Sequence, residues 1–296
     1  GCAVDRTARP IAMERRTLGW INGVIGVVLF SGTLPATRLA VIDLDPFYMT
    51  MTRAAVAGAL GAVLLLILRE CRPLRGDIRP LLVSSLGVVI GFPLFTALAL
   101  EHITAARGMV FLGLLPLSTA VFGVWRGGER MPMLFWLFAG LGSVFVAVYA
   151  IASGGGAAGT GDLYMVAAIA ICGLGYAEGG RLSRRLGGWQ VICWSLVLSL
   201  PATLPVALLM QPDWHGVGVP ALAGLAYVSV FSMLLGFIFW YTGLAQGGIA
   251  AVGQVQLLQP LLGLLLAAVI LGEPVGWDLA LVLVAVIACV AGARRN

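Results

Sequence analysis

The chain has no lysine, only two histidines and little charge of either sign. Charged residues make up 10% of its 296 residues, and all 18 basic residues are arginines. The absence of lysine excludes enzymes that depend on a Schiff-base lysine. His102 and His215 have no carboxylate and nucleophile partner at a recognisable spacing, and the sequence has neither a P-loop nor a zinc motif. We therefore predict that the protein is not an enzyme and has no cofactor or metal.

Cysteines are few and scattered, and the net charge does not indicate a nucleic-acid partner. Cys2, Cys71, Cys172, Cys193 and Cys289 are odd in number and follow neither a disulfide framework nor a metal-ligand spacing. The net charge of +5 comes from arginines that cluster between apolar stretches. Such clusters orient a chain in a membrane, so no nucleic-acid binding is predicted.

Long apolar stretches make up most of the sequence. Apolar residues reach 60%, and the mean hydropathy of +1.01 exceeds that of soluble proteins. From Trp214 to Gly272 there is no Asp, Glu, Lys or Arg over 59 residues, whereas one bilayer crossing needs about 20. The stretches lack the alternation of a membrane β-barrel. We predict an all-α integral membrane protein with ten transmembrane spans, numbered one to ten, near residues 17–38, 46–68, 78–99, 104–124, 132–151, 162–184, 189–210, 219–243, 249–270 and 276–293.

The arginines predict how these spans are oriented. When alternate loops are assigned to the two sides of the membrane, 15 of the 18 arginines fall on one side, which also holds both termini. Loops on the cytoplasmic side are enriched in arginine. We therefore expect both termini to be cytoplasmic, with residues 1–16 as a tail that precedes a retained first span.

An internal duplication is visible in polar and special residues. Three pairs recur at one spacing of 144 positions: Pro116 with Pro260, Gly128 with Gly272, and Glu129 with Glu273. A linker rich in Gly, Ser and Ala, residues 153–161, is expected to join a repeat at 17–152 to a repeat at 162–296. Each repeat holds five spans, an odd number, so the second enters the membrane from the opposite side. The sequence thus predicts an inverted repeat, as in many transporters.

The ten-span pattern, the Pro within spans four and nine, and the Gly–Glu just past each of them resemble the EamA-type branch of the drug/metabolite transporter superfamily. The resemblance implies a bacterial inner-membrane protein whose central cavity is lined by spans one to four and six to nine. Within that branch, the sequence looks most similar to exporters of amino acids. This resemblance implies secondary transport of small amphipathic metabolites, expected to be neutral, aromatic or Met/Thr-like amino acids. Carriers of drugs, sugars or nucleotide sugars remain alternatives; a membrane enzyme or structural subunit fits less well. Homo-oligomerisation stays open.

Two prolines and two charged residues within the spans are candidates for function. Pro116 and Pro260 each remove a backbone hydrogen bond, so they are predicted as gating kinks, with static packing kinks as the alternative. Glu178 is interpreted as a proton carrier or a partner for an amino group, or else as an ion pair with Arg181 one turn on. Arg53 either binds a carboxylate or extends its guanidinium to the nearer interface.

Aromatic and soft side chains complete the predicted substrate path. Phe92 and Phe95 are interior to span three, and several other aromatic residues lie near the predicted cytoplasmic ends of spans one, six and eight. Gln256 and Met109 share helix faces with Pro260 and Pro116. The predicted path residues are Trp20, Phe92, Phe95, Met109, Tyr164, Tyr176, Trp240, Tyr241 and Gln256. Glycine pairs four residues apart are expected to let helices approach closely, at Gly19/Gly23, Gly87/Gly91, Gly175/Gly179 and Gly243/Gly247.

Overall fold

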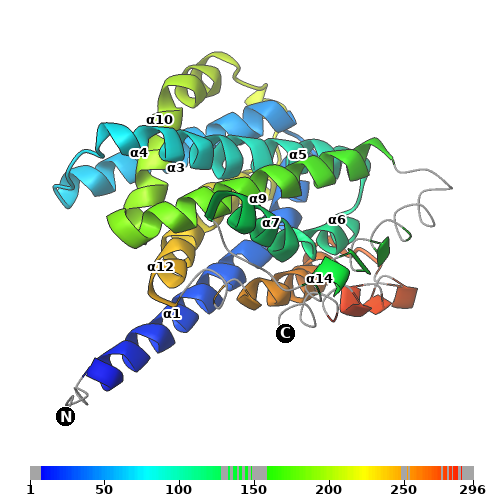
Figure 1. Ribbon diagram of the computed structural model, residues 1–296. Coiled ribbons are helices and arrows are strands. Elements are labelled where there is room, and N and C mark those ends of the chain that lie inside the picture. Colours follow the sequence, from blue (N-terminus) through cyan, green and yellow to red (C-terminus); the bar gives the residue numbers. More distant parts are fainter. Residues whose placement is uncertain are drawn as a thin grey trace, which may run out of the picture.

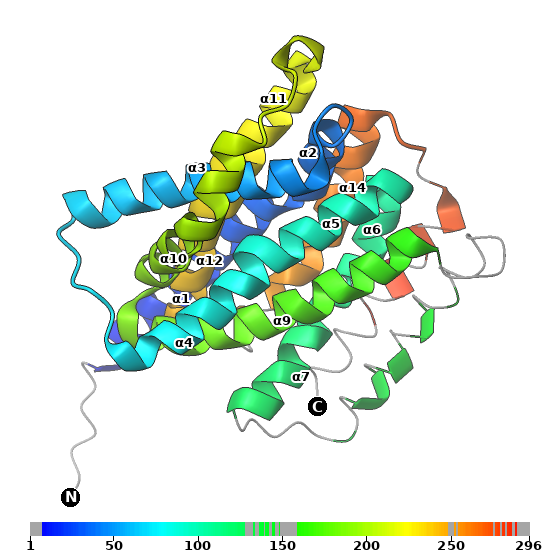
Figure 2. The ribbon, with the colours of Figure 1, turned by 90° about the horizontal axis from the view of Figure 1, so that it is seen from above.

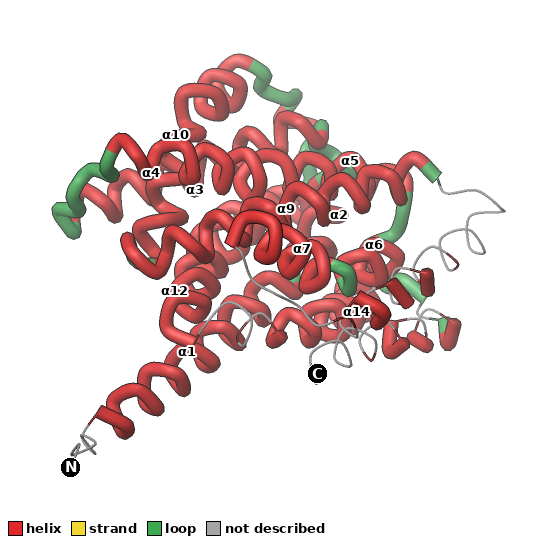
Figure 3. Tube along the Cα trace, viewed as in Figure 1, coloured by secondary structure: helices red, strands yellow, loops and turns green. Residues whose placement is uncertain are grey.

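The computed structural model describes residues 8–127, 159–247, 252 and 254–274, with scattered residues between 133 and 148 and between 276 and 288. Within these residues every regular element is a helix (Figure 3), and seven stretches are long and apolar enough to cross a membrane. The prediction of an all-α membrane fold is confirmed. Spans five and ten, the linker up to residue 158 and both termini lie largely outside the described residues. The count of ten spans, the domain boundaries and the cytoplasmic termini therefore stay predictions.

The described elements follow the predicted spans with local breaks. The first repeat contains α1 (Ala8–Ser31), α2 (Thr33–Ala40), α3 (Pro46–Ile67), α4 (Arg75–Ser84), the π-helix η1 (Ser85–Gly91), α5 (Phe92–His102), α6 (Ala105–Leu112) and α7 (Leu115–Gly127). The second contains α9 (Thr160–Leu186), α10 (Gly188–Leu209), the 3₁₀ turn η2 (Trp214–Gly216), α11 (Val219–Ala226), the π-helix η3 (Tyr227–Gly236), α12 (Phe237–Gly247), the 3₁₀ turn η4 (Gln254–Leu257) and α14 (Leu258–Leu271).

Short local signals set the helix ends. The Asp45 side chain caps α3 by accepting from the backbone N–H of Tyr48 at 2.8 Å, and Pro46 is the first helical residue, where a missing N–H costs nothing. Thr104 caps α6 through the N–H of Arg107 at 3.1 Å. Gly187 has a φ of 99°, which a residue with a Cβ rarely adopts, and it allows the sharp turn from α9 into α10.

The duplication is visible in the backbone. The π-helices η1 and η3 interrupt spans three and eight at equivalent places, and Ser85 and Ser229, which are 144 positions apart, lie one in each. Span four breaks before α7 and span nine changes from η4 to α14 at nearly the same offset. The repeats differ in their first spans, because span one breaks at Gly32 whereas α9 is continuous.

Contacts at the two ends show that the repeats run in opposite directions. At one end, called the basic end below, Asp77 at the start of α4 pairs with Arg185 at the end of α9. At the opposite end, the carboxylate of Glu273, just past α14, accepts from the N–H of Ala105 and of Ala106 at the start of α6. Span four thus begins where span nine ends, as the inverted repeat predicts. Figures 1 and 2 show α9 running alongside α4 and α5.

Glycines allow the close helix contacts that were predicted. A Cβ added to Gly19 of α1 would lie 2.5 Å from the backbone nitrogen of Gly247 of α12. A Cβ added to Gly87 of η1 would lie 2.8 Å from the Cα of Gly175 of α9. Helices in lipid associate by close packing, because burial gains little from the hydrophobic effect there. These glycines therefore help to fix which helices of the two repeats are neighbours.

Candidate substrate site

Five aromatic side chains from spans one, six and eight meet inside the bundle. We call Phe30, Tyr176, Phe237, Trp240 and Tyr241 the aromatic cluster, and all five are buried. The rings of Phe30 and Phe237 pack edge to face with centroids 4.9 Å apart, and those of Tyr176 and Trp240 lie 5.8 Å apart. Edge-to-face pairs add about 0.5–1.5 kcal/mol beyond the area they bury. The cluster contains three of the predicted path residues, Tyr176, Trp240 and Tyr241, all from the second repeat, together with Phe30 from the first.

Polar atoms in and beside the aromatic cluster lack protein partners. The side chains of Cys172 and Gln256 lie beside the hydroxyl of Tyr176, and Gln256 brings η4 of span nine next to the cluster. Gln256 is only 3% exposed, yet its Nε2 and the Nε1 of Trp240 have no hydrogen-bond partner in the described structure. An unpaired buried polar group costs about 1–3 kcal/mol, so retained ones are candidates for binding a ligand.

The hydroxyl of Tyr241 is hydrogen-bonded, in contrast to the Nε1 of its neighbour Trp240. This hydroxyl lies 3.2 Å from Ser84 Oγ, just before η1, and 3.4 Å from the carbonyl oxygen of Gly175, to which it donates. These bonds join spans three, six and eight on the side of the aromatic cluster toward the basic end. The hydroxyl of Tyr241 is thus engaged in holding helices together.

A second set of polar side chains lies next to Arg53. Its guanidinium, 1% exposed, donates from Nη2 to Ser232 Oγ of η3 at 3.5 Å. Ser232 Oγ is in turn hydrogen-bonded to Thr33 Oγ1 of α2 at 2.8 Å. The Nε and Nη1 atoms of Arg53 have no partner, and no described acidic residue pairs with it. This burial disfavours the interpretation in which the guanidinium extends to the interface.

The remaining aromatic path residues lie elsewhere. Tyr164, near the start of α9 at the opposite end, stacks on His102 with ring centroids 6.2 Å apart and contacts Phe95 at 6.1 Å. Phe92 is half-buried against the core three residues before Phe95. Trp20 is half-buried on α1, ten residues or about 15 Å before Phe30. The structure therefore separates the predicted path into an inner cluster and two outlying groups.

Spans four and nine touch through Met109, and each contains a proline just after a break in the helix. Met109 is fully buried, and its Cε would lie 2.2 Å from a Cβ on Gly263 of α14. Pro116 is the second residue of α7 and Pro260 the third of α14, so each follows a break and starts a new helical segment. Proline is tolerated there because N–H groups of the first turn have no intrahelical acceptor. Whether these breaks move during transport stays a prediction.

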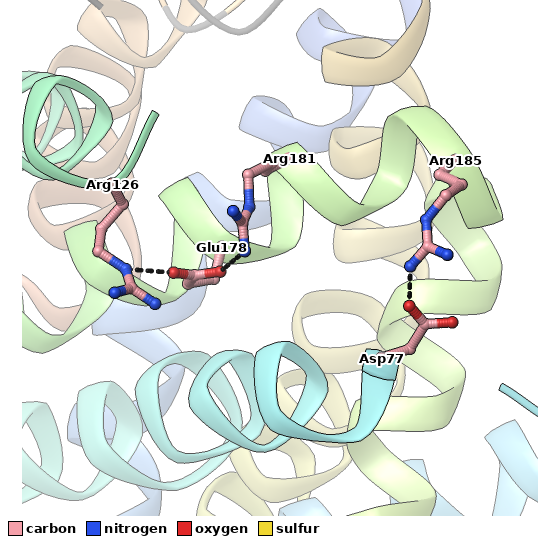
Figure 4. A network of polar contacts seen from close by, with 5 residues as sticks. All are labelled: Asp77, Arg126, Glu178, Arg181 and Arg185. Carbon is pink, nitrogen blue, oxygen red and sulfur yellow. Dashed lines mark hydrogen bonds and ion pairs between the residues drawn. The ribbon is translucent and has the colours of Figure 1, made fainter. Parts of the chain in front are cut away.

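Ion pairs join helices at the basic end of the bundle (Figure 4). Glu178 is completely buried, and its Oε1 lies 2.5 Å from Nε of Arg126 while Oε2 lies 2.9 Å from Nη2 of Arg181. About two turns after Glu178 on α9, Arg185 pairs with the buried Asp77. The ion-pair interpretation of Glu178 is therefore the one that the geometry supports. In the sequence, the one sign of Arg126 as a partner is that Glu178 and Arg126 are assigned to the same side of the membrane.

Several residues of the site escaped the sequence interpretation. Phe30 and Phe237 lie in uniformly apolar spans, where a phenylalanine carries no distinguishing pattern. Thr33 and Ser232 differ from their surroundings only as isolated hydroxyls. Their one available signal was position, because Thr33 directly follows the Gly32 break and Ser232 lies in a stretch equivalent to span three of the first repeat.

Comparison with known proteins places this architecture in a family. Residues 17–152 and 159–294 each match the EamA-like transporter family. The uncharacterized transporter YdeK of Bacillus subtilis is 64% identical over 284 residues, which cover 96% of this chain and 99% of that protein. A probable terminal-alkyne amino-acid exporter of Streptantibioticus cattleyicolor is 23% identical over 250 residues, 84% of each chain.

The fold itself also has a solved counterpart. A crystal structure at 21% identity superposes with a TM-score of 0.65 over 93% of this chain and 97% of that one. Two family matches in tandem agree with the repeated π-helices and the antiparallel spans four and nine. The chain is a multi-pass protein of the bacterial cytoplasmic membrane, and it belongs to the EamA-like transporter family.

Proposed function

We propose that the protein exports small amphipathic metabolites, namely neutral amino acids with aromatic or Met/Thr-like side chains, by alternating access. One observation carries the proposal: two buried donors, Trp240 Nε1 in the aromatic cluster and Gln256 Nε2 beside it, have no hydrogen-bond partner among the described residues. Aromatic faces accept an apolar side chain, and a few fixed polar groups orient the rest of the ligand. An amino acid presents these two kinds of surface together.

The arrangement of the repeats supports an alternating mechanism. The aromatic cluster combines spans one, six and eight with Gln256 of span nine, so it lies between the repeats, where transporters of this architecture place their ligand. Separate polar contacts hold each end: Glu178 with two arginines at the basic end, and Glu273 on α6 at the opposite end. Release of one set while the other holds would expose the site to one side at a time.

The name of the distant relative agrees with this cargo. That protein is described as a probable amino-acid exporter, and it aligns over most of both chains. Met109, buried where spans four and nine meet, supplies a soft surface that adapts to side chains of different shape. These two points favour amino acids over sugars, which need many more polar groups than this site contains.

Counterflow in proteoliposomes tests the proposal. Vesicles containing purified protein and loaded with unlabelled phenylalanine, methionine or threonine should accumulate the labelled amino acid transiently, and protein-free vesicles should not. The Gln256→Leu variant should lose most of this flux. Absence of counterflow with folded wild-type protein would overturn the amino-acid assignment. A thermal-shift screen with sugars, nucleotide sugars and hydrophobic drugs would then identify the alternative cargo.

A further inference from the structure

We propose that Arg53, with the hydroxyls around it, is a binding site for a carboxylate group of the transported solute. The inference rests on the proposed function, because it assigns one half of the amino acid to a position next to the aromatic cluster. It adds a specific chemistry: the ligand must carry an anionic group, and a cationic amine of the same shape is rejected.

The first support is a buried charge that has no acidic partner among the described residues. Arginine keeps its proton under all ordinary conditions, and burying a cation without an anion costs several kcal/mol, on the order of the whole stability of a domain. Arg53 is 1% exposed, and its one hydrogen bond, to Ser232, is long at 3.5 Å. Nε and Nη1 are free to donate. A residue serving only structure would be expected to have an acidic partner, as Arg107 has in Asp162.

The second support is a chain of hydroxyl groups that begins at that charge and runs through Ser232 to Thr33. Thr33 and Ser232 form a hydrogen-bonded pair, so one of the two hydroxyls can turn its own hydrogen toward a ligand. Thr50 lies three residues before Arg53 on the same helix face, and Thr37 lies one turn after Thr33. The Oγ1 atoms of Thr37 and Thr50 are buried and unpaired. Hydroxyl and guanidinium donors together form a surface that suits carboxylate oxygens.

The third support is the irregular backbone at this place. Thr33 follows the Gly32 break in span one, and Ser232 lies in the π-helix η3. Both interruptions leave backbone groups outside the regular hydrogen-bond ladder, and π-helical segments occur often at functional sites. Broken helices are tolerated at membrane depth where they face a binding region or are buried in protein.

The position of Arg53 relative to the aromatic cluster sets the orientation of the bound ligand. Phe30 precedes Thr33 by three residues across the Gly32 break, and Ser232 precedes Phe237 by five. Phe30 packs against both Phe237 and Trp240. An amino acid whose carboxylate contacts Arg53 therefore directs its side chain toward these rings. The ligand would span the two groups.

A panel of three related ligands separates the carboxylate from the other features. Phenylalanine has both charged groups, 3-phenylpropionate has only the carboxylate, and phenethylamine has only the amine. Thermal unfolding of the purified full-length protein is measured against each ligand. Phenylalanine and 3-phenylpropionate, which both carry a carboxylate, should stabilise the wild-type protein. Phenethylamine should bind at least about tenfold more weakly than either of them. Equal stabilisation by all three, or none by either carboxylate, would overturn the proposal.

Variants assign the discrimination to Arg53. Arg53→Met should lose the preference for carboxylates, whereas the exposed Arg72→Met should behave like wild type. Arg53→Lys keeps a point charge without the planar guanidinium fork, so it should keep the preference for carboxylates with about tenfold weaker binding. This variant is used for the test if Arg53→Met does not fold. A carboxylate preference that survives in Arg53→Met, or a complete loss in Arg72→Met, would contradict the assignment.

The same panel distinguishes this inference from the transport proposal. If wild type discriminates by carboxylate through Arg53 but shows no counterflow, the binding site stands and export of amino acids fails. If counterflow occurs and Arg53→Met transports with an unchanged preference, transport stands and the site fails.

Discussion

Glu178 on α9 and Arg126 on α7 form an ion pair with 2.5 Å between Oε1 and Nε, which ties span six to span four at the basic end. Glu178 is completely buried, while the side chains of Arg126 and of its second partner Arg181 are 44% and 53% exposed. The carboxylate is therefore fixed inside the protein, and the two guanidinium groups cover it from the solvent side. This asymmetry makes Glu178 the residue on which the contact depends.

Replacing Glu178 with Gln should lower thermal stability. Hydrogen bonds to charged groups are worth about 1.5–3 kcal/mol each when shielded, and the exposure of both arginines reduces this to about 1–2 kcal/mol in total. We expect a fall of several degrees in the unfolding temperature in detergent. Glu101→Gln, at an exposed position, is the control and should leave the temperature unchanged. An unchanged temperature for both variants would show that the contact contributes nothing.

The Glu178→Gln variant also decides between the two functional interpretations of this residue. Because both carboxylate oxygens already accept from guanidinium groups, we expect the pH dependence of counterflow to be the same in the variant and in wild type. Flux is compared over a series of external pH values in proteoliposomes. Loss of the pH dependence would instead identify Glu178 as a proton carrier.

Glu273 should act as a helix cap at the opposite end. Its two oxygens accept from the N–H of Ala105 at 3.0 Å and of Ala106 at 2.7 Å, across 168 and 167 positions of sequence. Carboxylates at helix N-termini contribute about 0.5–2 kcal/mol. Glu273→Ala should speed hydrogen exchange in the peptide that contains Ala105 and Ala106, measured by mass spectrometry. A peptide from α3 is the internal control, and equal acceleration there would mean general unfolding.

Gly243→Val should disrupt the contact between spans one and eight. A Cβ at this position would lie 2.8 Å from the backbone nitrogen of Gly23, and backbone atoms cannot move aside cheaply. Overpacking of this kind costs about 1–3 kcal/mol, so the unfolding temperature should fall. Gly76→Val is the matched control because nothing lies within 4 Å of a Cβ there. Similar losses in both variants would argue against close packing as the cause.

Gln256→Leu should separate function from stability. The Nε2 of Gln256 is buried and unpaired, so removal of the amide relieves a desolvation penalty while keeping most of the volume. We expect the unfolding temperature to stay equal or rise, and counterflow to fall at least about tenfold. Gln246→Leu, which changes an exposed amide bonded to Asn22, should retain flux. Full flux in Gln256→Leu would remove this residue from the path.

The sequence by itself determined the fold class and the repeat. Apolar stretches longer than a bilayer crossing leave no soluble alternative, and Pro116 with Pro260 marked one of the breaks that recur in both halves. Such features are local, because a proline or a glycine acts on its own turn of backbone wherever the rest of the chain lies. Each proline lies near the start of a helical segment that follows a break, and its role as a gating kink stays a prediction.

Only the tertiary structure decided which side chains meet. Arg53 and Ser232 are 179 positions apart, and Glu178 and Arg126 are 52 apart. Helical periodicity tells which face a residue occupies, but in so apolar a chain every face resembles the others, and hydrophobicity does not select a partner in lipid. Partners follow from close packing at glycines such as Gly19 and Gly87 and from the need to pair buried polar groups. Both are properties of several helices at once.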